Sequence, residues 1–331
     1  MVDYNALIDD EVWAYIRKVD SCYPPHAVDL SVDEQRKVYD RMCTAFRAPR
    51  PDGVMSWDEP YGGVTCRRYE VGASDVTVVY YHGGGSVVGS LESHDDICAE
   101  ICARTGYRVI AVEYALAPET LFPKCFEECW SAFEAIRSHW TGSIVLVGDS
   151  AGGNRAAAVA HFARDKDGER PVGQVLMYPS LGTRRTDRGS YVEHAQAPHL
   201  TTRDLAIYRL FRTGGVESAV DDPRHNPLQD SDFSHLPPTV VVTAQCDPLS
   251  SDGEEYRDAI LAAGGKAVWF KEPGLVHACL RARNMSARAR VFFDRAVDAI
   301  DALGKGDWPY LTASDARDAY TAGEWTLRDS A

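Results

Sequence analysis

Short apolar runs rich in β-branched residues alternate with longer helical stretches, and this alternation constrains the fold more than any other feature. Runs typical of strands lie at residues 64–71, 76–81, 107–114, 143–148, 173–179, 238–244 and 266–270. Helices are expected between them, around residues 94–105, 125–138 and 151–164. Such an alternation is typical of a parallel sheet covered by helices. We therefore expect an α/β fold with a central, mostly parallel twisted sheet and helices on both faces.

Two stretches do not follow this rhythm. The first fifty or so residues read as two helices, the second opened by the capping box Ser31 to Glu34. Residues 184–230 are polar and turn-rich, with a helix expected near 202–213, and read as an insertion over the sheet. The expected division is an N-terminal helical segment, two parts of a core around the insertion, and a tail after the last helix: 1–50, 51–183, 184–230, 231–303 and 304–331.

The charge and the hydrophobicity of the chain argue against several classes of binding partner. The chain has 331 residues with a formal net charge of −14, which argues against a nucleic-acid or anionic-membrane partner. No apolar run approaches the roughly 20 residues that a spanning helix needs, and the first residues show no signal-peptide pattern. We expect a cytoplasmic protein whose nine cysteines are free thiols, without a metal or cofactor.

The stretch Gly148-Asp149-Ser150-Ala151-Gly152 follows one of the expected strands and precedes an alanine-rich helix. It fits the G-x-S-x-G pattern of a nucleophile elbow, a tight turn that presents its serine to a substrate. The glycines fit because larger side chains two positions before and after the serine would clash. The simpler interpretation is an ordinary turn between a strand and a helix.

A glycine run at the end of an earlier strand adds to this pattern. His82 is followed by Gly83, Gly84 and Gly85, whose backbone N–H groups carry no side chain that could obstruct them. Such donors can stabilise the oxyanion of a tetrahedral intermediate. The alternative interpretation is a flexible turn beside a packed histidine.

A serine nucleophile needs a base, and the base needs a carboxylate that orients it. Asp247 follows the strand expected at 238–244, and His277 follows the last expected strand. Asp252 is the main rival to Asp247, but it lies further into the next helix. Seven other histidines do not follow a late strand, and we interpret them as surface or packing residues: His26, His139, His161, His194, His199, His225 and His235.

Taken together, these motifs resemble the hormone-sensitive-lipase-like family of α/β-hydrolases, the bacterial carboxylesterases with an H-G-G-G signature. The resemblance covers roughly residues 76–280. It rests on HGGGSVVGS, EYALAPE with the following FP, GDSAGGN, DPLSSDGEEY and the late His277. It implies an α/β-hydrolase fold with a helical cap made from the N-terminal segment and the insertion. It also implies metal-free hydrolysis of short to medium acyl esters.

Carried over residue by residue, the resemblance makes Ser150 the nucleophile, His277 the base and then the acid, and Asp247 the group that orients His277. The amides of Gly83, Gly84, Gly85 and Ala151 would form the oxyanion hole, and Ser86, Asp149, Tyr208 and Phe211 would line the substrate pocket. The chain departs from the family pattern at several positions that shape the pocket, among them Ser86, where relatives place a bulky aromatic residue. The others are Glu113, Ala115, Ser251, Ala278 and Cys279.

The sequence therefore predicts a serine carboxylesterase that cleaves short- to medium-chain esters through an acyl-enzyme. Two alternatives stay open: an amidase, deacetylase or lactonase acting on a small metabolite, and a non-catalytic ligand-binding protein on the same fold. We expect a small-molecule ester as the ligand, no nucleic-acid or membrane partner, and a homodimer as a candidate assembly.

Overall fold

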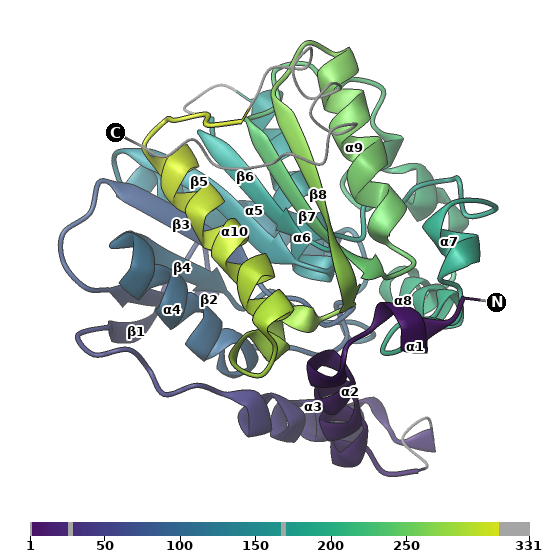
Figure 1. Cartoon of the computed structure of the whole chain (residues 1–331). Helices are drawn as coiled ribbons and strands as arrows, with labels where there is room; N and C mark the ends of the chain where they lie inside the picture. The colour runs from purple at the N-terminus through teal and green to yellow at the C-terminus, as the bar shows by residue number, and fades with distance from the viewer. Residues whose placement is uncertain (1, 26–28, 167–169, 311–331) are drawn as a thin grey trace.

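The computed structural model describes residues 2–25, 29–166 and 170–310, and its centre is an eight-stranded sheet (Figure 1). The strand order is β1-β2-β4-β3-β5-β6-β7-β8. In chain order the strands are β1 (Met55–Tyr61), β2 (Val64–Glu70), β3 (Val76–Tyr81), β4 (Arg108–Val112), β5 (Ser143–Asp149), β6 (Gly173–Met177), β7 (Thr239–Cys246) and β8 (Ala267–Val276). From β4 to β8 all neighbours are parallel, whereas β1 and β2 join the sheet in antiparallel pairs. The predicted fold class is confirmed.

The seven expected strands are present, and one further strand was not predicted. Strands β4 and β6 are buried along their whole length, which is why they read as continuous apolar runs. The unpredicted strand β1 has the sequence MSWDEPY and is exposed at most positions. It lies at the edge of the sheet, where polar residues and Pro60 are tolerated, so its sequence lacks an apolar pattern.

Helices cover both faces of the sheet (Figure 1). On one face, α4 (Asp95–Thr105) and α10 (Ala287–Gly304) pack over a core that includes Phe292 and Phe293. On the other face lie α5 (Lys124–His139), α6 (Ala151–Arg164) and α9 (Ser250–Ala262). The alanines of α6 are all buried, so this helix lies close against the sheet. That close packing holds the residue before the helix, Ser150, at a defined place.

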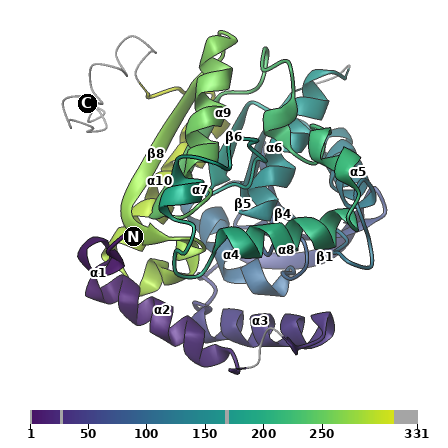
Figure 2. The same cartoon turned by 90° about the vertical axis from the view of Figure 1, so that its right-hand side faces the viewer.

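The remaining helices gather at one end of the sheet, as Figure 2 shows for α2, α3 and α8. They are α1 (Tyr4–Leu7), α2 (Asp10–Cys22), α3 (Val32–Phe46), α7 (Ser190–Glu193) and α8 (Thr202–Thr213). Short 3₁₀ turns complete the chain at η2 (Glu92–His94), η3 (Glu217–Asp221), η4 (Pro227–Gln229) and η5 (Cys279–Asn284). The capping box expected at Ser31 and Glu34 is formed at the start of α3.

Within the described ranges, no helix combines the length and apolar character needed to cross a bilayer. Residues 311–331, which make up most of the expected tail, lie outside the described part of the chain. The same holds for His26, one of the histidines weighed above.

Candidate active site

Ser150 lies at the turn between strand β5 and helix α6. Its backbone has φ 55° and ψ −118°, a conformation that residues other than glycine adopt at a cost. Glycine is required two residues later, at Gly152, because a Cβ there would overlap the carbonyl oxygens of Tyr81 and His82. The turn is therefore held by the approach of α6 to strand β3, and it lifts the Ser150 side chain out of the sheet.

Three side chains from separate loops meet at this turn. The Ser150 Oγ atom lies 2.8 Å from His277 Nε2, and His277 Nδ1 lies 2.7 Å from Asp247 Oδ2. Asp247 is fully buried, and its other oxygen accepts a 2.9 Å hydrogen bond from the Leu249 amide. The ring centroids of Tyr178 and His277 lie 4.9 Å apart, so the tyrosine limits the rotation of the imidazole. The geometry is that of a serine, a base and an orienting carboxylate.

The four amides predicted for the oxyanion hole do not all point the same way. The Gly83 amide donates to Asp149 Oδ1 at 2.9 Å, so it is already used inside the protein. Gly84, Gly85 and Ala151 line a cavity together with Ser150. Their amides have no hydrogen-bond acceptor among the residues described, which leaves them free for a ligand oxygen. His82 is buried and stacks on Tyr114, as expected of a packing residue.

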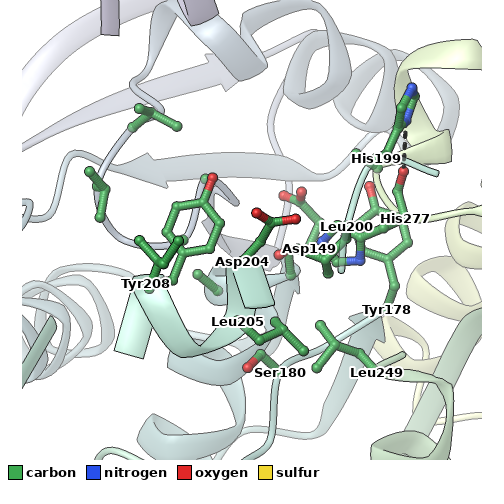
Figure 3. Close-up of a pocket in the computed structure, with 18 of the residues that line it drawn as sticks. Asp149, Tyr178, Ser180, His199, Leu200, Asp204, Leu205, Tyr208, Leu249 and His277 are labelled. Atoms are coloured by element: carbon green, nitrogen blue, oxygen red, sulfur yellow. Dashed lines mark hydrogen bonds between the residues drawn. The ribbon is translucent and has the colours of Figure 1, made fainter. Parts of the chain in front are cut away.

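The cavity has a volume of about 870 Å³ and is bordered by the helices at the end of the sheet. Helices α2 and α3 contribute mostly apolar wall residues, including Val19, Val38 and Met42. Tyr208 on α8 lies on one side, across from Tyr178 and His277 (Figure 3). The volume is within the range of small-molecule pockets in proteins.

Comparison with known proteins places the chain in a family. The sequence model of a family described as having the α/β-hydrolase fold matches residues 78–281. Over 256 residues the chain is 33% identical to the carboxylic ester hydrolase LipN of Mycobacterium tuberculosis, covering 72% of this chain and 67% of LipN. The chain belongs to the α/β-hydrolase family. Within that family it is one of the hormone-sensitive-lipase-like carboxylesterases.

Two further relatives extend over more of the chain. The ethyl acetate hydrolase of Pseudomonas putida is 29% identical over 83% of this chain and 92% of its own length. An esterase structure from the archaeon Pyrobaculum calidifontis superposes with a TM-score of 0.81 at 27% identity, covering 90% of this chain and 99% of that one. In the first curated relatives, including LipN, the matched part makes up about two thirds of the protein.

Asp149, in the nucleophile turn of this carboxylesterase, holds the glycine loop in place through hydrogen bonds. Its buried carboxylate accepts hydrogen bonds from Tyr80 at 2.8 Å and from the Gly83 amide, and lies 3.3 Å from His94 Nε2. Burial alone would raise the pKa of Asp149, but His94 and Tyr80 outweigh it and lower this pKa to about 2. Sequence reasoning missed Tyr80 and His94, because neither belongs to a motif.

The four residues predicted for the substrate pocket divide into two groups. Asp149, Tyr208 and Phe211 line the cavity, whereas Ser86 is not among its lining residues. Ser86 is buried, and its hydroxyl accepts a 3.2 Å hydrogen bond from Arg155. The ring of Tyr208 lies against Gly85, so closely that a Cβ on Gly85 would overlap it. Tyr208 therefore occupies space next to the glycine loop, and the position of Ser86 does not widen the cavity.

Ser86→Phe should lower the melting temperature and slow the hydrolysis of all esters in parallel. Ser86 is 1% exposed and has φ 60°, so a phenyl ring has neither space nor a relaxed backbone there. Overpacking of this kind costs about 1–3 kcal/mol. Thermal unfolding and an acyl-length series measure the two effects, with the exposed Ser138→Phe as the matched control. A stable variant that loses only the long esters would place Ser86 in the pocket wall after all.

Asp252, the rival carboxylate, is used elsewhere. It is fully buried and accepts hydrogen bonds from the amides of Leu181 and Gly182 and from the Tyr191 hydroxyl, at 2.7–3.0 Å. It therefore holds the loop after β6 and does not contact His277 in the structure. Burial raises the pKa of Asp252 to about 7, despite the hydrogen bonds that oppose this shift.

This raised pKa predicts a pH-dependent difference in stability between the wild type and Asp252→Asn. The native state keeps the Asp252 proton up to about pH 7, whereas the unfolded chain loses it near its usual value of 3.8. Relative to the variant, the wild type should lose stability as the pH rises from about 4 to about 7, by up to about 1.4 kcal/mol per pH unit. Urea unfolding of both proteins across this range measures the difference. A difference that does not change with pH would contradict the raised pKa.

The part of the chain that the structure describes contains no group of three or more His, Cys, Asp or Glu side chains placed to hold a metal ion. The nine cysteines are unpaired, and all except Cys22 are buried.

Proposed function

We propose that this carboxylesterase cleaves small carboxylic esters through an acyl-enzyme formed on Ser150. The observation that carries the proposal is the hydrogen-bonded chain from Ser150 through His277 to Asp247, facing free backbone amides across one cavity. A nucleophile, a base with its orienting carboxylate, and donors for an oxyanion are what acyl transfer requires. A small-molecule ester is the substrate.

The first half of the reaction transfers the acyl group to the enzyme. His277 Nε2 takes the proton of Ser150 Oγ as the oxygen attacks the ester carbonyl carbon. The resulting oxyanion accepts hydrogen bonds from the amides of Gly84 and Ala151, with Gly85 beside them. His277, now protonated and stabilised by Asp247, gives its proton to the departing alkoxide. An alcohol leaves, and the acyl group stays on Ser150.

Water completes the cycle by the same steps in reverse. His277 takes a proton from a water molecule, whose oxygen attacks the acyl carbonyl, and the same amides hold the second oxyanion. The tetrahedral intermediate collapses, His277 returns its proton to Ser150 Oγ, and the carboxylic acid leaves. Throughout, Asp247 accepts the hydrogen bond from His277 Nδ1 and so holds the imidazole in the tautomer that presents Nε2 to Ser150.

From the family resemblance we expect a preference for short and medium acyl groups. The cavity between the sheet and the N-terminal helices has a volume of about 870 Å³, which leaves room for both the acyl and the alcohol part of a small ester. The similarity to an ethyl acetate hydrolase points the same way. Turnover of 4-nitrophenyl esters should be fastest for acyl chains up to about eight carbons and fall for longer ones, which is the preference that the family resemblance implies for this small-molecule pocket.

A series of 4-nitrophenyl esters from acetate to palmitate measures this preference, and the matching anilides and lactones are tested beside it. Highest rates on long-chain emulsions would contradict the size limit. Faster hydrolysis of the anilides than of the esters would instead favour the amidase alternative.

A further inference from the structure

Two buried arginines lack the partners that buried arginines normally have. Six arginines in the described part of the chain are buried. Four of them donate to carboxylates, to backbone carbonyls or to a tyrosine hydroxyl: Arg108, Arg164, Arg281 and Arg283. Arg155 and Arg212 form no ion pair with any described residue. A buried cation without a counter-ion is costly, so this pair calls for an explanation.

Arg155 lies in α6, one turn after the nucleophile, within an otherwise alanine-rich stretch. Its side chain has no solvent exposure. One guanidinium nitrogen, Nη2, donates to Ser86 Oγ at 3.2 Å, whereas Nε and Nη1 have no hydrogen-bond partner among the described residues. A hydroxyl cannot balance a full positive charge, so Arg155 leaves this part of the interior electropositive.

Arg212 lies in the last turn of α8 and adds a second positive charge, which lies at the cavity wall. It is 7% exposed, it lines the cavity that contains Ser150, and its Nε has no partner. Burial and the nearby charge of Arg155 lower the pKa of Arg212 to about 10, which still leaves it protonated at neutral pH. The two guanidinium groups repel each other, and an anion at this wall of the cavity would reduce the repulsion.

His225 adds a third unpartnered group. Its side chain is fully buried, and neither ring nitrogen has a hydrogen-bond partner in the described structure. Burial, with the charges of Arg212 and Arg155, lowers the pKa of His225 to about 2. The ring is therefore neutral and carries one N–H donor. Most of the unpartnered buried atoms in this region are therefore donors, from Arg155, Arg212 and His225, and one acceptor, Asn154 Oδ1, lies among them.

The acidic residues of the cavity do not serve this cluster. Asp149 is engaged by Tyr80 and Gly83, as described above. Asp204 is at the opposite end of α8, about 12 Å from Arg212 along the helix at 1.5 Å per residue. There it accepts hydrogen bonds from the amide and the hydroxyl of Thr201 and so helps to cap the helix. Asp20 is an exposed residue of helix α2. The counter-ion that the arginines lack is therefore one that a ligand could bring.

Resting on the esterase function proposed above, we propose that Arg212, backed by Arg155, binds a free carboxylate group of the substrate. The substrate class is then a monoester of a small dicarboxylic acid, with its ester at Ser150 and its carboxylate at Arg212. A guanidinium can hold a carboxylate through two parallel hydrogen bonds, which gives direction as well as strength. Ser180, Gly182 and Asn226 line the same cavity with Ser150 and Arg212.

The test compares two 4-nitrophenyl esters that differ only in charge, the monoester of glutaric acid and that of its neutral monoamide, glutaramic acid. The wild type should prefer the carboxylate ester by at least about ten-fold in kcat/KM, as a charge-assisted hydrogen bond would give. In Arg212→Gln this ratio should fall to about one. Because the ratio is taken within one protein, a loss of folded enzyme cancels. A wild-type ratio near one, or a preference that survives in Arg212→Gln, would overturn the proposal.

Arg203→Gln is the matched control, since Arg203 is exposed on the same helix and does not line the cavity. Arg203→Gln should keep the wild-type ratio. If it loses the preference for the carboxylate ester, general surface charge causes that preference. Calorimetry of Ser150→Ala with monomethyl glutarate gives a readout that does not depend on hydrolysis. If monomethyl glutarate binds to the Ser150→Ala protein, and adding Arg212→Gln abolishes this binding, the carboxylate site is supported even if the esterase chemistry is wrong. Hydrolysis of both esters at equal rates would refute the site and leave the esterase function standing.

Discussion

Ser150→Ala should lower the turnover of 4-nitrophenyl acetate by about three orders of magnitude or more while leaving the protein folded. The hydroxyl that points at His277 Nε2 across 2.8 Å is the nucleophile of the proposed reaction, and alanine offers no atom to replace it. The fold should survive, because the strained backbone at φ 55° bears an L residue with a Cβ in either case. Steady-state kinetics and thermal unfolding measure both parts of this expectation.

Ser138→Ala is a matched control for this change, since it removes the same hydroxyl from an exposed position of α5. It should keep full activity. A fluorophosphonate should label the wild type at Ser150 alone, as peptide mass spectrometry would reveal. If the label is found on another serine, or if Ser150→Ala keeps its activity, the nucleophile has been assigned wrongly.

Asp247→Asn should reduce kcat by about four orders of magnitude, the scale of the same exchange in other serine triads. Asp247 Oδ2 accepts a 2.7 Å hydrogen bond from the Nδ1–H group of His277, so Nε2 is left unprotonated and able to accept the Ser150 proton. An amide nitrogen in that place would favour the opposite tautomer. The carbonyl of asparagine can still accept from the Leu249 amide, so the loop should keep its conformation.

Asp252→Asn separates this effect from the general loss of a buried carboxylate in the same segment. It changes a fully buried aspartate five residues further along the chain that does not contact His277. Its activity should stay within about ten-fold of the wild type, since the proposed triad is intact. Equal losses in the two variants would show that the segment, and not the His277 contact of Asp247, matters for catalysis.

Local pattern was enough to place the candidate reactive groups in the chain. Ser150, Asp247 and His277 each follow an apolar run rich in β-branched residues, and the carboxyl ends of parallel strands meet at one edge of a sheet. A correct strand assignment therefore predicts that side chains far apart in sequence lie together. Strand β1 escaped prediction for the complementary reason, because an exposed edge strand carries no apolar period.

What the amino-acid sequence determined by itself is the fold class, the family and the three strand ends that carry Ser150, Asp247 and His277, because all of them depend on local spacing of residue types. The tertiary structure alone decided which amides and side chains face the cavity. Gly83 turns to Asp149 and Ser86 to Arg155, although both belong to the glycine motif. The direction in which such an amide or side chain points depends on packing between segments that are distant in the chain. For the same reason only the structure reveals that Arg155 and Arg212 have no counter-ion among the described residues.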